Sequence, residues 1–175
     1  MTFDPTPRSD VPDERLVERA RAGDREAFDA LVRRYLGPAR NFCAKLLGDP
    51  ALAEDCCQEG FVKAWRGLPG FRAEAKFRTW LWRILVNAAN DIRRPRLAEL
   101  EEDMDPVAIP ERDIAAEEAV AAALARLPER QRQVLLMKVE LDATPQEIAD
   151  ALGISYENAK ANLSLARKKM RELLK

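Results

Sequence analysis

The sequence TPQEIADALGISYENAKANLSLARKKMREL, residues 144–173, contains two amphipathic segments separated by a glycine. Its first four residues have the capping-box pattern with proline at the first helical position, which predicts the start of a short helix. Gly153 ends this helix, and Ser155 is placed to cap a second helix that runs to about Leu174. The pattern therefore predicts two helices joined by a tight turn.

The small residues around this turn are typical of a helix-turn-helix. Ala149 lets the two helices cross closely, and Gly153 can adopt the left-handed conformation that the turn needs. The side chains that would meet a DNA major groove lie on the second helix: Ser155, Tyr156, Glu157, Asn158, Lys160, Ala161 and Ser164. Further along, positive charge suited to phosphates comes from Arg167, Lys168, Lys169 and Arg171. A plain three- or four-helix bundle with a basic tail is the alternative.

The rest of the ordered sequence also has helical periodicity. The expected helices cover 13–22, 24–47 with a kink or break at Gly37-Pro38, 50–66, 77 to about 92 before Pro95, a segment from about 114, and a segment from Pro128. No strand pattern occurs. We therefore expect an all-α protein of two small helical bundles, the second containing the helix-turn-helix.

The formal net charge of −1 hides a strong segregation of charge along the chain. Residues 60–96 carry nine basic residues against two acidic ones, residues 97–118 carry nine acidic residues against one basic, and the last sixteen are basic again. Two basic blocks separated by an acidic segment indicate two polyanion-binding modules on a flexible linker. The expected divisions are a disordered head over 1–12, a domain over 13–95, an acidic linker over 96–113 and a domain over 114–175. Solvated helix faces are the alternative explanation.

Residues 71–91, FRAEAKFRTWLWRILVNAAND, combine aromatic and cationic side chains. The apolar stripe of the expected helix includes Trp80 but not Trp82, and Phe71 and Phe77 flank a loop rich in Arg and Lys. Unpaired DNA suits this combination, because bases stack on rings for about 1–3 kcal/mol each while cations hold the phosphates. The alternative is that Phe71 and Trp82 only widen the contact within the core.

The outer face of the expected 50–66 helix is acidic and bordered by aromatic rings. The residues on this face are Glu54, Asp55, Gln58 and Glu59, beside Phe61 and Trp65. Such a face suits docking on a basic helix of a partner, and a solvated face is the alternative.

Composition excludes several classes of function. The chain has no His, which excludes His-dependent catalysis and His-ligated metal sites, and its three cysteines, Cys43, Cys56 and Cys57, form no CxxC motif. No run approaches the roughly 18 apolar residues of a membrane span, and the first residues do not form a secretory signal. We expect a cytoplasmic protein that is not an enzyme and uses no metal or cofactor.

Four stretches together resemble the extracytoplasmic-function (ECF) sigma factors of bacterial RNA polymerase, within the superfamily of the housekeeping sigma factors. They are AEDCCQEGFVKAW (53–65), GFRAEAKFRTWLWRILVNAAND (70–91), LARLPERQRQVLLMK (124–138) and the sequence 144–173 quoted above. The resemblance covers about residues 13–94 and 115–175. It implies a transcription initiation factor that binds core RNA polymerase, directs it to specific promoters and promotes DNA melting.

The resemblance also implies a role for each segment. The 50–66 helix would bind the clamp helices of the largest polymerase subunit through Asp55, Gln58, Glu59, Phe61 and Trp65. The next segment would melt and read the minus-10 element, with a flipped base in its loop, through Phe71, Arg72, Lys76, Phe77, Thr79, Trp80, Trp82, Arg83 and Asn87. The last helix would read the minus-35 element through Ser155, Tyr156, Glu157, Asn158, Lys160, Ala161, Ser164, Arg167 and Lys168. The acidic linker would pass near the polymerase active site.

The implied partners are core RNA polymerase (clamp helices and flap), promoter DNA and an anti-sigma factor. Asn162 and Leu165 stand where family members often carry Arg, which weakens the expected minus-35 contact. Cys56-Cys57 replaces an apolar pair, which we expect to be core packing, and Trp82 replaces a common Tyr. Two rival functions are a stand-alone helix-turn-helix regulator of duplex DNA, and a decoy that binds polymerase or an anti-sigma factor without reading DNA.

Overall fold

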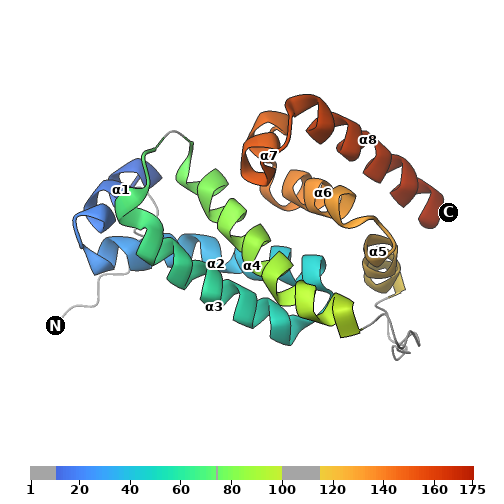
Figure 1. Cartoon of the computed structure of the whole chain (residues 1–175), viewed down its shortest axis with the longest axis horizontal. Helices are drawn as coiled ribbons and strands as arrows, with labels where there is room; N and C mark the ends of the chain where they lie inside the picture. The colour runs from blue at the N-terminus through green and yellow to red at the C-terminus, as the bar shows by residue number, and fades with distance from the viewer. Residues whose placement is uncertain (1–10, 74, 100–114) are drawn as a thin grey trace.

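The computed structural model describes residues 11–73, 75–99 and 115–175, and all regular structure in these residues is helical (Figure 1). This confirms the predicted all-α class. The elements are α1 (Asp13–Arg21), α2 (Arg25–Leu47), α3 (Pro50–Gly67), the short 3-10 helix η2 (Leu68–Gly70), α4 (Phe77–Glu99), α5 (Ala115–Ala125), α6 (Glu129–Leu141), α7 (Pro145–Leu152) and α8 (Tyr156–Leu173). The predicted head and linker lie mostly outside the described residues.

Side-chain caps begin four of these helices at the residues that the sequence indicated. Asp24 and Asp49 accept backbone hydrogen bonds at the starts of α2 and α3. Thr144 and Glu147 form a complete capping box at α7, and Ser155 accepts from the Asn158 N–H at α8. These caps satisfy N–H groups that have no partner within the helix.

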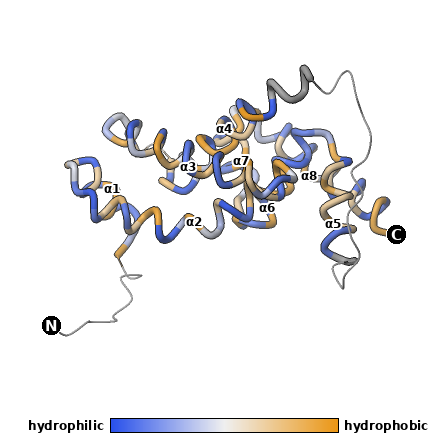
Figure 2. The backbone as a smooth tube through the Cα atoms, turned by 90° about the horizontal axis from the view of Figure 1, so that it is seen from below, coloured by the Kyte–Doolittle hydropathy of each residue, from blue (hydrophilic) through white to orange (hydrophobic). Residues whose placement is uncertain are grey.

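Helices α1 to α4 form the first block, in which α2 packs against α1, α3 and α4. Hydrophilic and hydrophobic segments alternate along these helices (Figure 2). The apolar side turns inward, and the interior contains fully buried Leu31, Phe42, Leu81 and Leu85. Helix α3 turns one stripe of small and apolar residues to this interior: Ala53, Cys56, Cys57, Gly60, Phe61 and Ala64.

Of the kink or break predicted at Pro38, the break does not occur, and the helix end predicted at Pro95 was wrong. Helix α2 continues through Pro38 without a break, and α4 continues through Pro95 to Glu99, so the first residues of the predicted linker are helical. At Pro38 the preceding residue is Gly37, which has no Cβ to clash with the proline ring. The buried Ala39 and Phe42 beyond it hold the helix in place. At Pro95 the helix loses one backbone N–H donor. The helical turns before Pro95 are already formed, so the helix continues without the cost of starting a new one.

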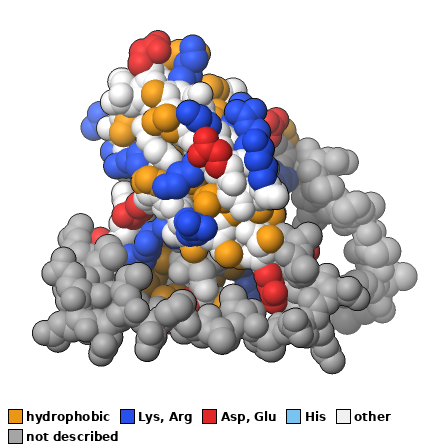
Figure 3. Space-filling model, turned by 90° about the vertical axis from the view of Figure 1, so that its right-hand side faces the viewer, with side chains coloured by type: hydrophobic (Ala, Val, Ile, Leu, Met, Phe, Trp, Pro, Cys, Tyr) orange, Lys and Arg blue, Asp and Glu red, His pale blue; other side chains and the backbone are white. Residues whose placement is uncertain are grey.

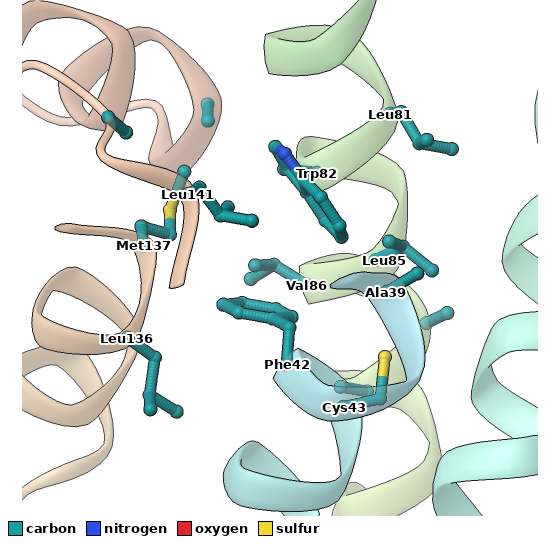
Figure 4. Packing of buried hydrophobic residues seen from close by; sticks show 14 of the residues in the cluster. Ala39, Phe42, Cys43, Leu81, Trp82, Leu85, Val86, Leu136, Met137 and Leu141 are labelled. Carbon is teal, nitrogen blue, oxygen red and sulfur yellow. The ribbon is translucent and has the colours of Figure 1, made fainter. Parts of the chain in front are cut away.

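Helices α5 to α8 form the second block, and this block packs directly against the first. Helix α6 lies against α2, and α7 lies against α4. The prediction that Trp82 stands outside the buried stripe was therefore wrong: its side chain is 1% exposed. Figure 4 shows Trp82 extending from α4 toward Met137 and Leu141 of α6, with Phe42 beside it. Periodicity within α4 could not show this burial, since Trp82 is covered on one side by rings of α2 and on the other by residues of the second block.

Candidate nucleic-acid interface

The outer face of α8 is the most open of the candidate sites. Ala159, Leu163 and Ala166 turn toward the core. All nine residues predicted to read duplex DNA, Ser155, Tyr156, Glu157, Asn158, Lys160, Ala161, Ser164, Arg167 and Lys168, are exposed. Gly153 has the predicted left-handed backbone, and Ala149 and Ala159 are buried between the crossing helices. The helix-turn-helix geometry is thus present, with its second helix accessible.

Positive charge gathers beside this face. A hollow next to the start of α7 is lined by Lys160, Arg167 and Arg171 together with Ser164. The Lys160 ammonium lies 5.3 Å from the centre of the Tyr156 ring, a cation–π contact that holds both side chains at the helix start. Figure 3 shows many Lys and Arg side chains on the upper part of the side where α8 lies in Figure 1. Such a surface suits phosphate contacts.

The second candidate site is the loop between η2 and α4 with the first turns of α4. Phe71, Phe77 and Trp80 form one aromatic cluster: the Phe71 and Trp80 ring centres lie 4.9 Å apart, and Phe77 lies 5.8 Å from Trp80. Ala73 in this loop has a positive φ of 57°, uncommon for alanine. A cavity beside the loop is lined by Phe71, Ala73, Ala75, Lys76 and Phe77, and on its other wall by residues of α1.

The predicted residues of this second site separate into two groups. Phe71, Phe77, Thr79 and Trp82 are buried, and Trp80 is half-buried. The exposed group consists of Arg72, Lys76, Arg83 and Asn87. The alternative that Phe71 and Trp82 pack in the core therefore describes this conformation, while the cations of the same segment remain accessible.

The third candidate site is the outer face of α3. Asp55, Gln58 and Glu59 are exposed as predicted, and Glu59 pairs with Lys63 at 2.7 Å within the helix. Phe61 is buried and Trp65 half-buried, with the Trp65 ring 4.9 Å from Phe28 of α2. A shallow apolar hollow at this edge is lined by Phe28, Phe61, Val62 and Trp65. The face combines acidic groups with a hydrophobic edge.

Sequence reasoning missed Arg78 and Glu147, which join the two blocks. Arg78 Nη2 donates to Glu147 Oε1 at 3.2 Å, and Lys76 Nζ lies 3.4 Å from the same oxygen. Burial alone would raise the pKa of Glu147, but hydrogen bonds from the Thr144 N–H and hydroxyl, with the two cations, lower it to about 2. The capping-box pattern accounted for Glu147 locally and gave no sign of this second role.

The three cysteines are buried thiols in the interior of the first block. Cys43 Sγ lies 3.5 Å from Cys56 Sγ, and the neighbouring thiols and burial raise the pKa of Cys43. Within the described residues, no cluster of three Cys, Asp or Glu side chains has the arrangement of a metal site. In the same residues, no helix is both long and apolar enough to span a membrane.

A helix-turn-helix with an exposed cationic second helix, and an aromatic loop edged by cations, are both features typical of DNA-binding proteins. A model of Sigma-70 region 2 matches residues 31–96, and a model of Sigma-70 region 4 matches residues 117–170. The chain therefore belongs to the sigma-70 family, and within it to the ECF sigma factors, which are transcription initiation factors.

Individual relatives match along nearly the whole chain. The ECF RNA polymerase sigma factor SigM of Mycobacterium tuberculosis is 34% identical, over 95% of this chain and 87% of its own. The sigma factor NccH of Alcaligenes xylosoxydans xylosoxydans is 33% identical, over 93% and 94% of the two chains. Among solved structures, CnrH in complex with the cytosolic domain of CnrY has a TM-score of 0.74 at 29% identity, covering 93% of this chain and 96% of its own.

Proposed function

We propose that this sigma factor divides promoter binding between its two blocks and binds core RNA polymerase through α3. In this proposal the outer face of α8 reads the minus-35 element as duplex, and the loop before α4 with its cations contacts the melted minus-10 element. The acidic face of α3 docks on the polymerase clamp helices, and the second block contacts the flap. The chain acts in the cytoplasm and supplies binding and not bond chemistry.

The observation that carries the proposal is that all nine predicted residues, at the start and on the outer face of α8, are exposed. If α8 packed against other helices on its outer face as well, some of these nine residues would be buried. Here one side is held in the core by Ala159, Leu163 and Ala166, so the other side is free to enter a major groove as a rigid unit.

The polymerase contact is supported by the arrangement of α3. Its acidic residues are exposed on one side, and Phe61, Val62 and Trp65 line an apolar hollow at the edge. A central apolar contact surrounded by charges is the usual composition of a specific interface. A duplex-only regulator would have no use for this face.

An anti-sigma factor is part of the same proposal. The relative CnrH was solved in complex with the cytosolic domain of CnrY. The relative RpoE, from Bartonella quintana, was solved in complex with the anti-sigma factor NepR. RpoE has a TM-score of 0.73 to this chain at 25% identity, over 84% of this chain and 96% of its own. We propose that this chain is likewise controlled by a protein inhibitor.

The decisive experiment is in vitro transcription by core polymerase with this chain on a library of genomic fragments. Discrete transcripts that appear only when both proteins are present are the expected result. The Lys160→Ala/Arg167→Ala variant should lose transcripts from promoters with a minus-35 element. Sequence-specific duplex binding without any transcript would instead identify a stand-alone regulator, and polymerase binding without DNA recognition would identify a decoy.

A further inference from the structure

The two blocks meet at the surface that the proposed function assigns to the minus-10 element. Lys76 and Arg78 belong to the segment that begins α4, and both contact the Glu147 carboxylate of α7. The Glu147 side chain is only 16% exposed, whereas Lys76 remains 72% exposed. One carboxylate of the second block thus neutralises two cations of the first.

Trp82 lies one turn further along α4 and is covered by the same block. Its ring is 5.4 Å from Phe42 of α2, and Met137 and Leu141 of α6 lie on its other side (Figure 4). Within the described part of the chain, Trp82 Nε1 is buried without a hydrogen-bond partner. A buried donor of this kind weakens the closed packing and favours states in which it reaches water.

Further polar contacts hold the blocks together away from the aromatic site. Lys45 of α2 pairs with Glu140 of α6 at 2.5 Å, and Gln133 of α6 donates to Asn90 of α4 at 2.9 Å. Arg132 of α6 donates to the Leu46 carbonyl at 3.4 Å. These ion pairs and hydrogen bonds surround apolar side chains of both blocks that form one buried cluster, and such mixed contacts are common between domains of one chain that move relative to each other.

We infer that this packing is a closed state in which the second block covers the Trp82 side of the proposed minus-10 surface and the Glu147 carboxylate occupies the place of a DNA phosphate beside Lys76 and Arg78. The inference rests on the proposed function. Binding of unpaired DNA requires the second block to move away, and DNA phosphates compete with Glu147 for the same two cations. The free chain therefore binds unpaired DNA more weakly than the opened chain.

The contact between the blocks is tested by carbodiimide cross-linking of the full chain, because this reagent joins amines and carboxylates that form ion pairs. Peptides linking Lys45 to Glu140 and Lys76 to Glu147 are expected from the monomer band. An excess of single-stranded dT20 should reduce both products. If the monomer yields neither product, the closed state does not exist in solution.

The role of Glu147 is tested by Glu147→Gln, which removes the charge and keeps a residue that completes a capping box. The matched control is Asp150→Asn, an equal charge change on the same helix at a side chain that bonds only Gln146 in the described contacts. Fluorescein-labelled dT20 should bind Glu147→Gln about threefold to fivefold more tightly than wild type, the range expected for a partly exposed ion pair. Asp150→Asn should stay within about twofold of wild type.

The outcomes separate this inference from the proposed function. Equal affinity of wild type, Glu147→Gln and Asp150→Asn for dT20, with promoter-dependent transcription intact, overturns the closed state alone. A matching gain in both variants also overturns it, because the effect would be one of net charge. The proposed function fails only in the transcription experiment.

Discussion

A Cβ atom added to Gly60 on α3 would lie 2.5 Å from Cδ2 of Leu85 on α4, so these helices touch at the glycine itself. Leu85 is fully buried and has little room to move aside. Gly60→Ala gains about 1 kcal/mol of helix propensity and loses about 1–3 kcal/mol to overpacking. We expect a net loss of about 1 kcal/mol in urea unfolding.

The control for this prediction is a double-mutant cycle with Leu85→Ala. Shortening Leu85 removes the clash, so Gly60→Ala should cost less in that background than in wild type. If the Gly60→Ala cost is the same in both backgrounds, the Gly60–Leu85 contact is not its cause.

The stability of the closed packing should depend on pH through Glu147. Its pKa in the folded chain is about 2, below its ordinary value of 4.5, so its contribution is complete above about pH 4.5 and disappears as the pH falls toward 2. The difference in unfolding free energy between wild type and Glu147→Gln should therefore shrink between pH 5 and pH 2. Urea titrations of both proteins across this range measure it, and a difference that stays constant contradicts the assignment.

Polymerase binding should depend on the acidic face of α3. Asp55→Lys/Glu59→Lys should abolish co-purification with core polymerase and leave the far-UV circular dichroism unchanged, because both side chains are exposed. Glu18→Lys/Glu26→Lys makes the same charge change at exposed positions on α1 and α2 and should bind normally. Retained binding by the α3 variant would remove α3 from the interface.

Promoter opening is best tested with the exposed cations near the aromatic loop. Arg72→Ala/Arg83→Ala should reduce permanganate reactivity of the melted minus-10 region, while stability changes by less than about 0.5 kcal/mol. Trp82→Ala is a poor test, since removing this buried ring should itself cost about 3–5 kcal/mol. Normal permanganate reactivity of the Arg72/Arg83 variant would show that these cations do not hold the open strand.

The affinity of α8 for duplex DNA should increase when a missing cation is restored. Leu165 is 53% exposed on α8, so Leu165→Arg should strengthen duplex binding and steepen its salt dependence by about one further phosphate contact. Leu174→Arg adds the same charge at an exposed leucine beyond the end of α8 and serves as control. An equal gain in both variants would indicate a general charge effect.

Local chemistry was the most predictable part of the fold. The caps at Asp24, Asp49, Thr144 and Ser155 and the turn at Gly153 depend on neighbouring residues, and the sequence contains those neighbours. The course of α2 through Pro38 was not predictable from proline alone, because Gly37 and the buried side chains beyond it decide the outcome. Trp82 shows the same limit for the candidate site: its partners on α6 are more than fifty residues away, and only tertiary packing brings them together.

Because Cys43, Cys56 and Cys57 are buried, the rate at which their thiols react measures how often the core of this protein opens. The chain has no other cysteine, so alkylation of the native protein proceeds only through the excursions that expose α2 and α3 to solvent. The rate of thiol modification, followed by intact mass, therefore reports those excursions without any introduced label. When promoter DNA or an inhibitor stabilises the first block, the three native thiols should react more slowly. A cysteine introduced on the surface should still react at once.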